Sequence, residues 1–182
     1  PLRRSYSLAV PVEQAGGQSF ESFLRTRIFA PLGMDAVRHN SDALRPGDNV
    51  ATGYALADFK DLQPAPRLSW HNASGAGGLY ASAYDMAKWM RLQLAGGAYR
   101  DAAGREQRMF EEKTQQQMWS VITPITVPQP PVPELLAAKP NYIGYGQGWT
   151  LSDYRGNKLV WHTGGWPGMV SRLTLVPERR LG

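Results

Sequence analysis

A histidine followed by a threonine and two glycines is the most chemically suggestive stretch of the sequence. His162, Thr163, Gly164 and Gly165 directly follow the short β-like run "KLVW". Glycines at a strand edge leave backbone N–H groups open, and such a group can stabilise the negative oxygen of an acyl-transfer transition state. A histidine beside them can bind a carboxylate or assist proton transfer. Taken alone, the same residues also fit a polar strand end followed by turn glycines.

Other familiar site chemistries find no support in the sequence. The histidines His39, His71 and His162 lack metal-ligand spacing, and no H-E-x-x-H motif occurs, which disfavours a metal site. There is no G-x-S-x-G nucleophile elbow. The glycine-rich stretch 73–80 lacks the G-K-[ST] of a phosphate loop, so we expect a tight turn there. Cysteine is absent, which excludes disulfides and a cysteine nucleophile. No cofactor is implied.

Two helices are expected to support the site. In the range 18–34, Ser19 is a plausible N-cap, and Pro31 and Gly33 should end the helix. Residues 82–97 form the strongest helical pattern, with a Ser82–Asp85 capping box at the start and two glycines at the end. The faces predicted to be apolar comprise Phe20, Phe23, Leu24 and Ile28 in the first helix and Met86, Trp89 and Met90 in the second. A shorter helix is expected over residues 110–119.

The C-terminal forty residues change character. Ranges 143–151, 158–163 and 169–177 are three strand candidates, joined by a hairpin turn at 155–157 and by the "GGWPG" connection at 164–168. They predict an antiparallel meander, and with the preceding helices an α+β fold in which helices flank an antiparallel sheet.

Two further segments are expected to be irregular. Residues 35–70 should be rich in loops, with weak strand signals at 49–56. Residues 123–140 hold six prolines, so neither a central strand nor a helix interior suits them, and we expect an extended surface segment.

Composition narrows the class of protein. The chain has 182 residues, of which 42% are hydrophobic and 19% charged, as expected for one globular domain. Its formal charge is +5, but the basic residues are scattered and no RNA-binding signature occurs, so nucleic-acid binding is disfavoured. No apolar run approaches the roughly 18 residues of a membrane span.

Several stretches together resemble the serine β-lactamase and penicillin-binding-protein-like superfamily, in particular class C β-lactamases and their esterase and D-aminopeptidase relatives. They are "FLRTRIFAPLGM", "GAGGLYASAYDMAKWM", "YGQGW" and "WHTGGWPGMVSRLTLVPE". They span most of the chain in the family's order. The resemblance implies a β-lactamase/transpeptidase-like fold, here incomplete.

The resemblance also implies a set of site residues: a Ser-x-x-Lys nucleophile motif, a Tyr-x-Asn motif and a Lys/His-x-Gly box. The box corresponds to His162-Thr163-Gly164, and the oxyanion amide to that of Gly165. Tyr6 is the candidate for the catalytic tyrosine, but Leu8 stands where the family has asparagine. A packing or surface role for Tyr6 is an equal alternative.

The nucleophile motif is missing, because no lysine is preceded by a serine three residues earlier. Residues 1–182 are therefore interpreted as a partial serine hydrolase domain, truncated at both ends, and we expect no acylation of this chain alone. The parent reaction would be acyl-serine transfer on a β-lactam, a D-amino-acid peptide or a small ester. Histidine in place of lysine in the box favours peptidase or esterase relatives. The alternative is a non-catalytic binding protein on the same scaffold.

Partners and compartment follow from the same resemblance. The expected partner is a small-molecule or peptide substrate, and the family favours a periplasmic or secreted location. If strands of the domain are missing, open sheet edges would favour association of the chain with itself or with the rest of the domain.

Overall fold

The computed structural model describes residues 9–56, 58, 60–69 and 74–182. They form two compact units. The first unit comprises the chain up to Lys88, with Asp101–Gly104 and Gly164–Val170. The second unit comprises Trp89–Arg100, Arg105–Thr163 and Ser171–Gly182.

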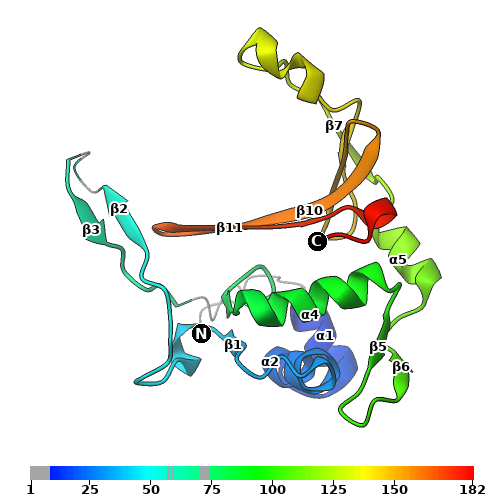
Figure 1. Cartoon of the computed structure of the whole chain (residues 1–182). Helices are drawn as coiled ribbons and strands as arrows, with labels where there is room; N and C mark the ends of the chain where they lie inside the picture. Colours follow the sequence, from blue (N-terminus) through cyan, green and yellow to red (C-terminus); the bar gives the residue numbers. More distant parts are fainter. Residues whose placement is uncertain (1–8, 57, 59, 70–73) are drawn as a thin grey trace. The chain divides into compact units, whose positions relative to one another are not determined.

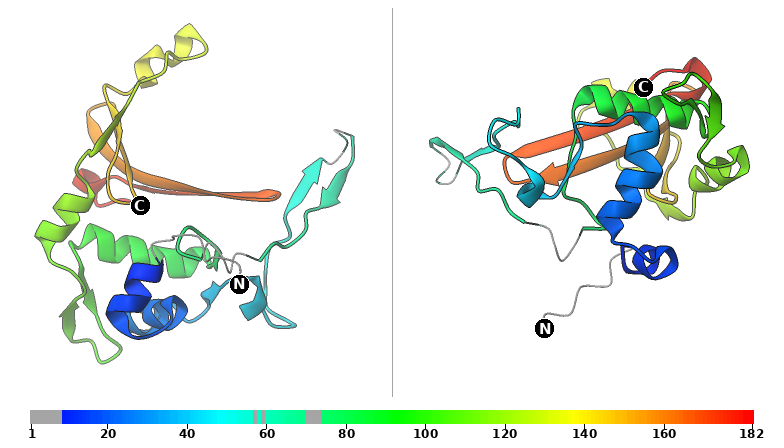
Figure 2. Two further views of the ribbon diagram at one scale, coloured as in Figure 1. Left: turned by 180° about the vertical axis from the view of Figure 1, so that it is seen from behind. Right: turned by 90° about the horizontal axis from the view of Figure 1, so that it is seen from below.

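The first unit is mainly helical and carries two small sheets (Figure 1). Its helices are α1 (Ala9–Gly16), α2 (Phe20–Leu24), the π-helical turn η1 (Arg25–Phe29), α3 (Ala30–Leu32), the 3-10 turn η2 (Ser41–Ala43) and the start of α4 (Ala83–Leu94). Its paired strands are β1 (Arg38–His39) with β4 (Leu79–Tyr80), and β2 (Tyr54–Leu56) with β3 (Leu62–Pro64). Figure 2 shows β2 and β3 as a separate hairpin.

The second unit is built on a five-stranded antiparallel sheet in the order β11-β10-β9-β8-β7, so consecutive strands are neighbours. The strands are β7 (Thr123–Ile125), β8 (Ile143–Tyr145), β9 (Thr150–Tyr154), β10 (Asn157–Trp166) and β11 (Met169–Leu175). The unit also holds the hairpin β5 (Ala98–Arg100) and β6 (Glu106–Arg108), helix α5 (Glu112–Met118) and the 3-10 turns η4 (Pro133–Ala138) and η5 (Pro177–Arg179). The α+β fold and the antiparallel meander are thus confirmed.

The core of the second unit lies against this sheet. Its fully or nearly fully buried members are Trp149, Leu151, Val160 and Leu175. Partly buried side chains from α4, from α5 and its C-cap residue, and from β11 pack on them, namely Met90, Leu94, Met118, Trp119 and Leu173. Apolar burial of this kind fixes which face of β10 points inward, because a one-residue slip would reverse every side chain.

The helix predicted over 18–34 is confirmed, with one irregular turn. The Ser19 hydroxyl accepts the Ser22 N–H at 3.2 Å, as an N-cap should. The run passes through the π-helical turn before it ends at Gly33, whose φ of 64° is the left-handed conformation that glycine adopts without strain. Pro31 lies within the last turn rather than ending the helix.

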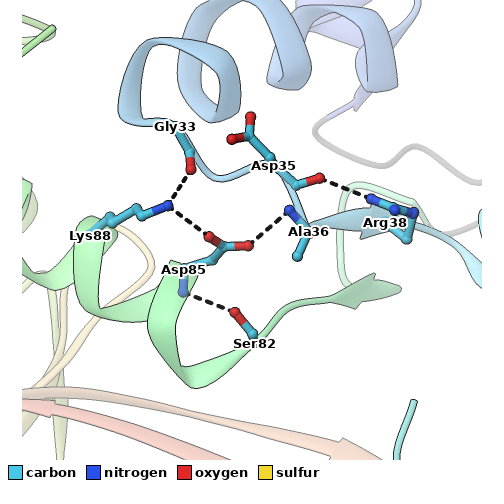
Figure 3. A network of polar contacts seen from close by, with 7 residues as sticks. All are labelled: Gly33, Asp35, Ala36, Arg38, Ser82, Asp85 and Lys88. Atoms are coloured by element: carbon cyan, nitrogen blue, oxygen red, sulfur yellow. Dashed lines mark hydrogen bonds and ion pairs between the residues drawn. The ribbon is translucent and has the colours of Figure 1, made fainter. Parts of the chain in front are cut away.

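The predicted capping box of α4 is only half correct. The Ser82 hydroxyl accepts the Asp85 N–H at 3.0 Å, as expected. The Asp85 carboxylate does not return the bond to Ser82. It accepts the Ala36 N–H at 3.1 Å and the Lys88 ammonium at 3.1 Å instead, and Lys88 also donates to the Gly33 carbonyl (Figure 3). A residue predicted to cap a helix therefore links that helix to the loop after α3.

Two predicted strand boundaries were wrong. The range 143–151 is two strands, β8 and β9, because the chain reverses in a tight turn closed by the Gly146 N–H bonding the Trp149 carbonyl at 2.8 Å. The first two glycines of "GGWPG", Gly164 and Gly165, do not form the turn before β11. They belong to β10, which continues to Trp166, and only Gly168 lies in the turn, where the chain reverses at Pro167–Gly168.

The proline-rich segment holds more regular structure than expected. Residues 123–125 form β7 at the edge of the sheet, where the missing N–H of Pro124 is tolerated, and 133–138 form the 3-10 turn η4. Sequence analysis did not predict helix α1 or the β5–β6 hairpin.

Candidate active site on strand β10

The residues singled out from the sequence lie on the last part of β10. His162, Thr163, Gly164 and Gly165 are all exposed. Pairing of β10 with β9 ends at Trp161, opposite Thr150. Beyond that point β10 keeps β11 as its neighbour, and no strand in the described part of the chain pairs with its other edge. From His162 onward this edge of β10 therefore has no partner strand among the described residues.

Gly165 has open space where a side chain would lie. A Cβ built on this residue would meet no atom within 4 Å, and its φ lies outside the left-handed region. Neither packing nor backbone conformation requires glycine here. Gly168 differs, because its φ is 73° and a Cβ would approach the Tyr54 carbonyl oxygen to 2.7 Å. Gly168 thus serves the turn, whereas Gly165 has open space on its Cβ side.

His162 has a side-chain partner that the sequence did not indicate. Its Nε2 lies 3.1 Å from the Tyr145 hydroxyl oxygen, and the ring centroids are 6.1 Å apart with the planes tilted by 59°. Tyr145 is the last residue of β8. The predicted meander placed the strand 143–151 beside 158–163, but it assigned Tyr145 no contact with His162. Tyr145 begins the "YGQGW" stretch that contributed to the family resemblance, but no site role was predicted for it.

The turn that follows the candidate residues is held within the first unit. The Tyr54 N–H donates to the Gly168 carbonyl at 3.3 Å, and a Cβ on Gly53 would lie 2.5 Å from the Pro167 oxygen. The indole of Trp166 packs edge-on against the Tyr80 ring, with centroids 6.3 Å apart. Backbone contact at Gly53 and ring contact at Tyr80 thus fix the end of the β10–β11 hairpin.

The part of β10 that precedes the candidate residues is held within the second unit. The Lys158 ammonium donates to the Trp119 carbonyl at 3.0 Å. The Trp161 indole N–H donates to the Ser152 hydroxyl at 3.1 Å, and the Arg172 guanidinium lies 4.2 Å from the Trp161 ring centroid. These contacts fix the rotation of the strand, and with it the direction in which His162 projects.

Two titratable groups away from His162 have shifted pKa values: Asp153 in β9 and Tyr142 just before β8. Burial raises the pKa of Asp153, but hydrogen bonds from the Asn141 side chain and from the N–H groups of Asn141 and Tyr142 outweigh it, so the pKa lies below its ordinary value. Burial, followed by the charges of Asp153 and Glu178, raises the pKa of Tyr142. Neither group contacts His162.

The remaining residues considered from the sequence do not join the site. Tyr6 and His71 lie outside the described residues. His39 is largely buried in the first unit, edge-on to Phe20 and with Nδ1 3.4 Å from a Glu21 carboxylate oxygen. Within the described ranges, no cluster of three or more potential metal ligands occurs, and no helix is long and apolar enough to cross a membrane.

Comparison with known proteins decides the family. The family model described as beta-lactamase matches residues 5–182. This chain belongs to the beta-lactamase family. The structure of the octameric penicillin-binding protein homologue from Pyrococcus abyssi superposes with a TM-score of 0.74 at 21% identity over 95% of this chain and 34% of that one. At 21% identity, this similarity to a solved structure shows a shared fold.

Two further relatives carry the names of hydrolytic enzymes. The unguisins hydrolase ungD' of Aspergillus campestris is 26% identical over 92% of this chain and 28% of its own length. The D-amino acid amidase of Ochrobactrum anthropi SV3 has a TM-score of 0.60 at 24% identity over 88% of this chain and 41% of that one. This chain therefore spans roughly a third of the length of the relatives that it matches first.

Proposed function

We propose that residues 162–165 line the substrate-binding strand of a hydrolase that transfers an acyl group to a serine and then to water. The observation that carries the proposal is the exposed edge of β10 from His162 onward, which no longer pairs with β9, with open space on the Cβ side of Gly165. An extended substrate can add to such an edge through main-chain hydrogen bonds.

Each residue of the edge has a distinct role in this proposal. The Gly165 N–H donates to the oxygen that becomes negative when the substrate carbonyl is attacked. Thr163 and Gly164 hold the substrate backbone in register along the strand. His162 binds an oxygen of the substrate or assists the departure of the amine. Tyr6 is the candidate general base from the sequence.

The nucleophile is proposed to come from polypeptide outside these residues, because no lysine here has a serine three positions before it. In the first step the serine Oγ bonds to the carbonyl carbon, the C–N bond breaks, and the serine proton passes through the base to the amine. In the second step water attacks the ester, which releases the acid and restores the serine. Residues 1–182 are thus proposed to be one part of a catalytic domain.

The proposed substrate is an amide bond that involves a D-amino acid residue. One family relative is named a D-amino acid amidase and another an unguisins hydrolase. Histidine in the box, in place of the lysine of classical β-lactamases, supports an amide or ester over a β-lactam. The amide is preferred because the first of these relatives is named an amidase.

Covalent labelling tests the proposal. The complete reading frame that encodes these residues is expressed and incubated with a fluorescent penicillin or with D-phenylalanine amide. We expect D-phenylalanine amide to be hydrolysed faster than the L form, and the penicillin adduct to map to a serine outside residues 1–182. In the same protein, His162→Gln should lower kcat/KM on the order of 100-fold. The 182-residue chain alone should acquire no adduct.

Adduct formation on a serine of the 182-residue chain, or unchanged kcat/KM in His162→Gln, would contradict the proposal. Lys60→Gln is a matched control, because this exposed lysine on the segment between β2 and β3 has no role in it. Its kcat/KM should equal that of the unmodified protein.

A second candidate function, a binding protein without catalysis, is favoured by the missing Ser-x-x-Lys motif. It predicts that D-phenylalanine amide binds, as measured by calorimetry, without any hydrolysis by the complete protein. A Ser-x-x-Lys upstream of Tyr6 in the gene supports the enzyme, and a start codon close to Pro1 supports the binding protein.

A further inference from the structure

The hydrogen bond between Tyr145 and His162 gives the two ring nitrogens of the histidine different surroundings. Nε2 lies 3.1 Å from the tyrosine hydroxyl oxygen. Nδ1 has no hydrogen-bond partner among the described residues, and no carboxylate of the described chain lies within ion-pair distance of the ring. One nitrogen is therefore committed to the protein, while the other is left for a ligand.

The chemistry of the two groups decides the direction of this bond. A phenol is a good donor, and the bare nitrogen of a neutral imidazole is a far better acceptor than a phenol oxygen. Which nitrogen of a histidine carries the proton is set by the bond that the other nitrogen makes. For a neutral ring, this chemistry favours the Tyr145 hydroxyl as the donor to Nε2, which leaves the ring proton on Nδ1.

We propose that Tyr145 is a positioning residue that fixes the tautomer and orientation of His162, so that Nδ1–H is the group presented at the open edge of β10. The geometry that supports this is the Oη···Nε2 distance of 3.1 Å and the tilted, unstacked arrangement of the two rings. The tautomer rests on contacts within the protein alone, and only the assignment of a substrate oxygen as the acceptor of Nδ1–H rests on the proposed function.

The tautomer defines the substrate group that His162 can bind. A neutral ring that donates through Nδ1–H and accepts through Nε2 from Tyr145 has no free acceptor. It holds a carbonyl or carboxylate oxygen of the substrate and does not remove a proton from it. This separates two roles that the sequence left open for the histidine, and it assigns His162 to binding.

Nitrogen-15 NMR of the imidazole rings in the chain as described provides the test, since it reports which ring nitrogen bears the proton. Spectra are recorded at a pH of about 9, where an ordinary histidine is neutral. We expect the His162 signals, assigned by their loss in His162→Gln, to show a protonated Nδ1 and a bare Nε2. In Tyr145→Phe, which keeps the ring but removes the hydroxyl, the proton should return mainly to Nε2.

Two controls separate this effect from general disturbance of the fold. Tyr142→Phe removes a hydroxyl at the start of the same strand region, makes no contact with His162, and should leave the tautomer unchanged. The signals of His39, which is packed against Phe20 in the first unit, should be the same in every variant.

A proton found on Nε2 of His162 in the unmodified chain would overturn the proposal, and so would a tautomer that Tyr145→Phe leaves unaltered. If Tyr145→Phe fails to fold, as judged by its circular dichroism, the spectrum of the unmodified chain still decides. The experiment uses no substrate, so its outcome is independent of whether the proposed hydrolysis is found.

Discussion

Two polar clusters of this chain lie in opposite surroundings. At the start of α4, Asp85 is 2% exposed, and its two carboxylate oxygens accept bonds from Ala36 and Lys88 (Figure 3). On β10, His162 is exposed and Tyr145 occupies one of its ring nitrogens. A buried polar group whose bonds are all made holds backbone in place, whereas an exposed group with bonding capacity left can take a ligand.

The largest expected effect comes from breaking the buried cluster. Asp85→Ala should lower the free energy of unfolding by about 3 kcal/mol, because it removes the acceptor of the Ala36 N–H and the carboxylate that pairs with the Lys88 ammonium, which keeps the Gly33 carbonyl as its acceptor. We take the low end of the usual range because the Lys88 side chain is 25% exposed. Urea denaturation followed by circular dichroism measures the change.

The contrast depends on two comparison variants. Asp35→Ala removes a neighbouring carboxylate that bonds no other described residue, and His162→Gln alters the exposed cluster. Both should stay within about 0.5 kcal/mol of the unmodified chain. If His162→Gln costs as much as Asp85→Ala, the distinction between a structural cluster and a ligand-binding one fails.

A pair of glycines sharpens the comparison at the level of the backbone. A Cβ on Gly53 would lie 2.5 Å from the Pro167 oxygen, whereas one on Gly165 would meet nothing within 4 Å. Gly53→Ala should therefore cost about 1 to 3 kcal/mol in the free energy of unfolding. Gly165→Ala should change it by less than about 0.5 kcal/mol. Thermal melts of the two variants and the unmodified chain measure the difference, and a melting temperature of Gly165→Ala lowered as far as that of Gly53→Ala would show that Gly165 is also required by packing.

The helices show what local sequence can determine. Their apolar faces recur over many residues, and the caps Ser19 and Ser82 act on the adjacent turn, so both helices could be predicted. Asp85 was assigned correctly as a residue of the first turn, but its carboxylate bonds a residue 49 positions away. Sequence periodicity contains no information on such a partner.

The site was predictable in part for the same reason. The order His-Thr-Gly-Gly after an apolar run placed these residues on a strand, although the glycines were expected in the turn. They lie within β10 because the reversal occurs at Pro167–Gly168, where the chain is held by Gly53. The contact between Tyr145 and His162 arises only when β8, β9 and β10 pair, so it could not be read from either segment alone.

A third polar cluster, at Asp153, lies between these two cases, because its carboxylate is hydrogen-bonded but not deeply buried. We expect its effect on the free energy of unfolding to be smaller than that of Asp85 and larger than that of His162. Its carboxylate oxygens accept the Asn141 N–H and side-chain amide, each at 2.6 Å, and the pKa lies below the ordinary 3.8 because these bonds outweigh the effect of burial. A carboxyl whose pKa is lowered by folding stabilises the fold above the unfolded pKa, and this contribution is lost as the pH falls through the folded pKa. The difference in unfolding free energy between the unmodified chain and Asp153→Asn should therefore shrink between about pH 5 and about pH 2, by less than about 1 kcal/mol because the group is partly exposed. Urea denaturation of both proteins across that range measures it. A difference that stays constant with pH would mean that the Asn141 bonds add nothing that depends on the charge of Asp153, and that burial alone separates the structural cluster at Asp85 from the open one at His162.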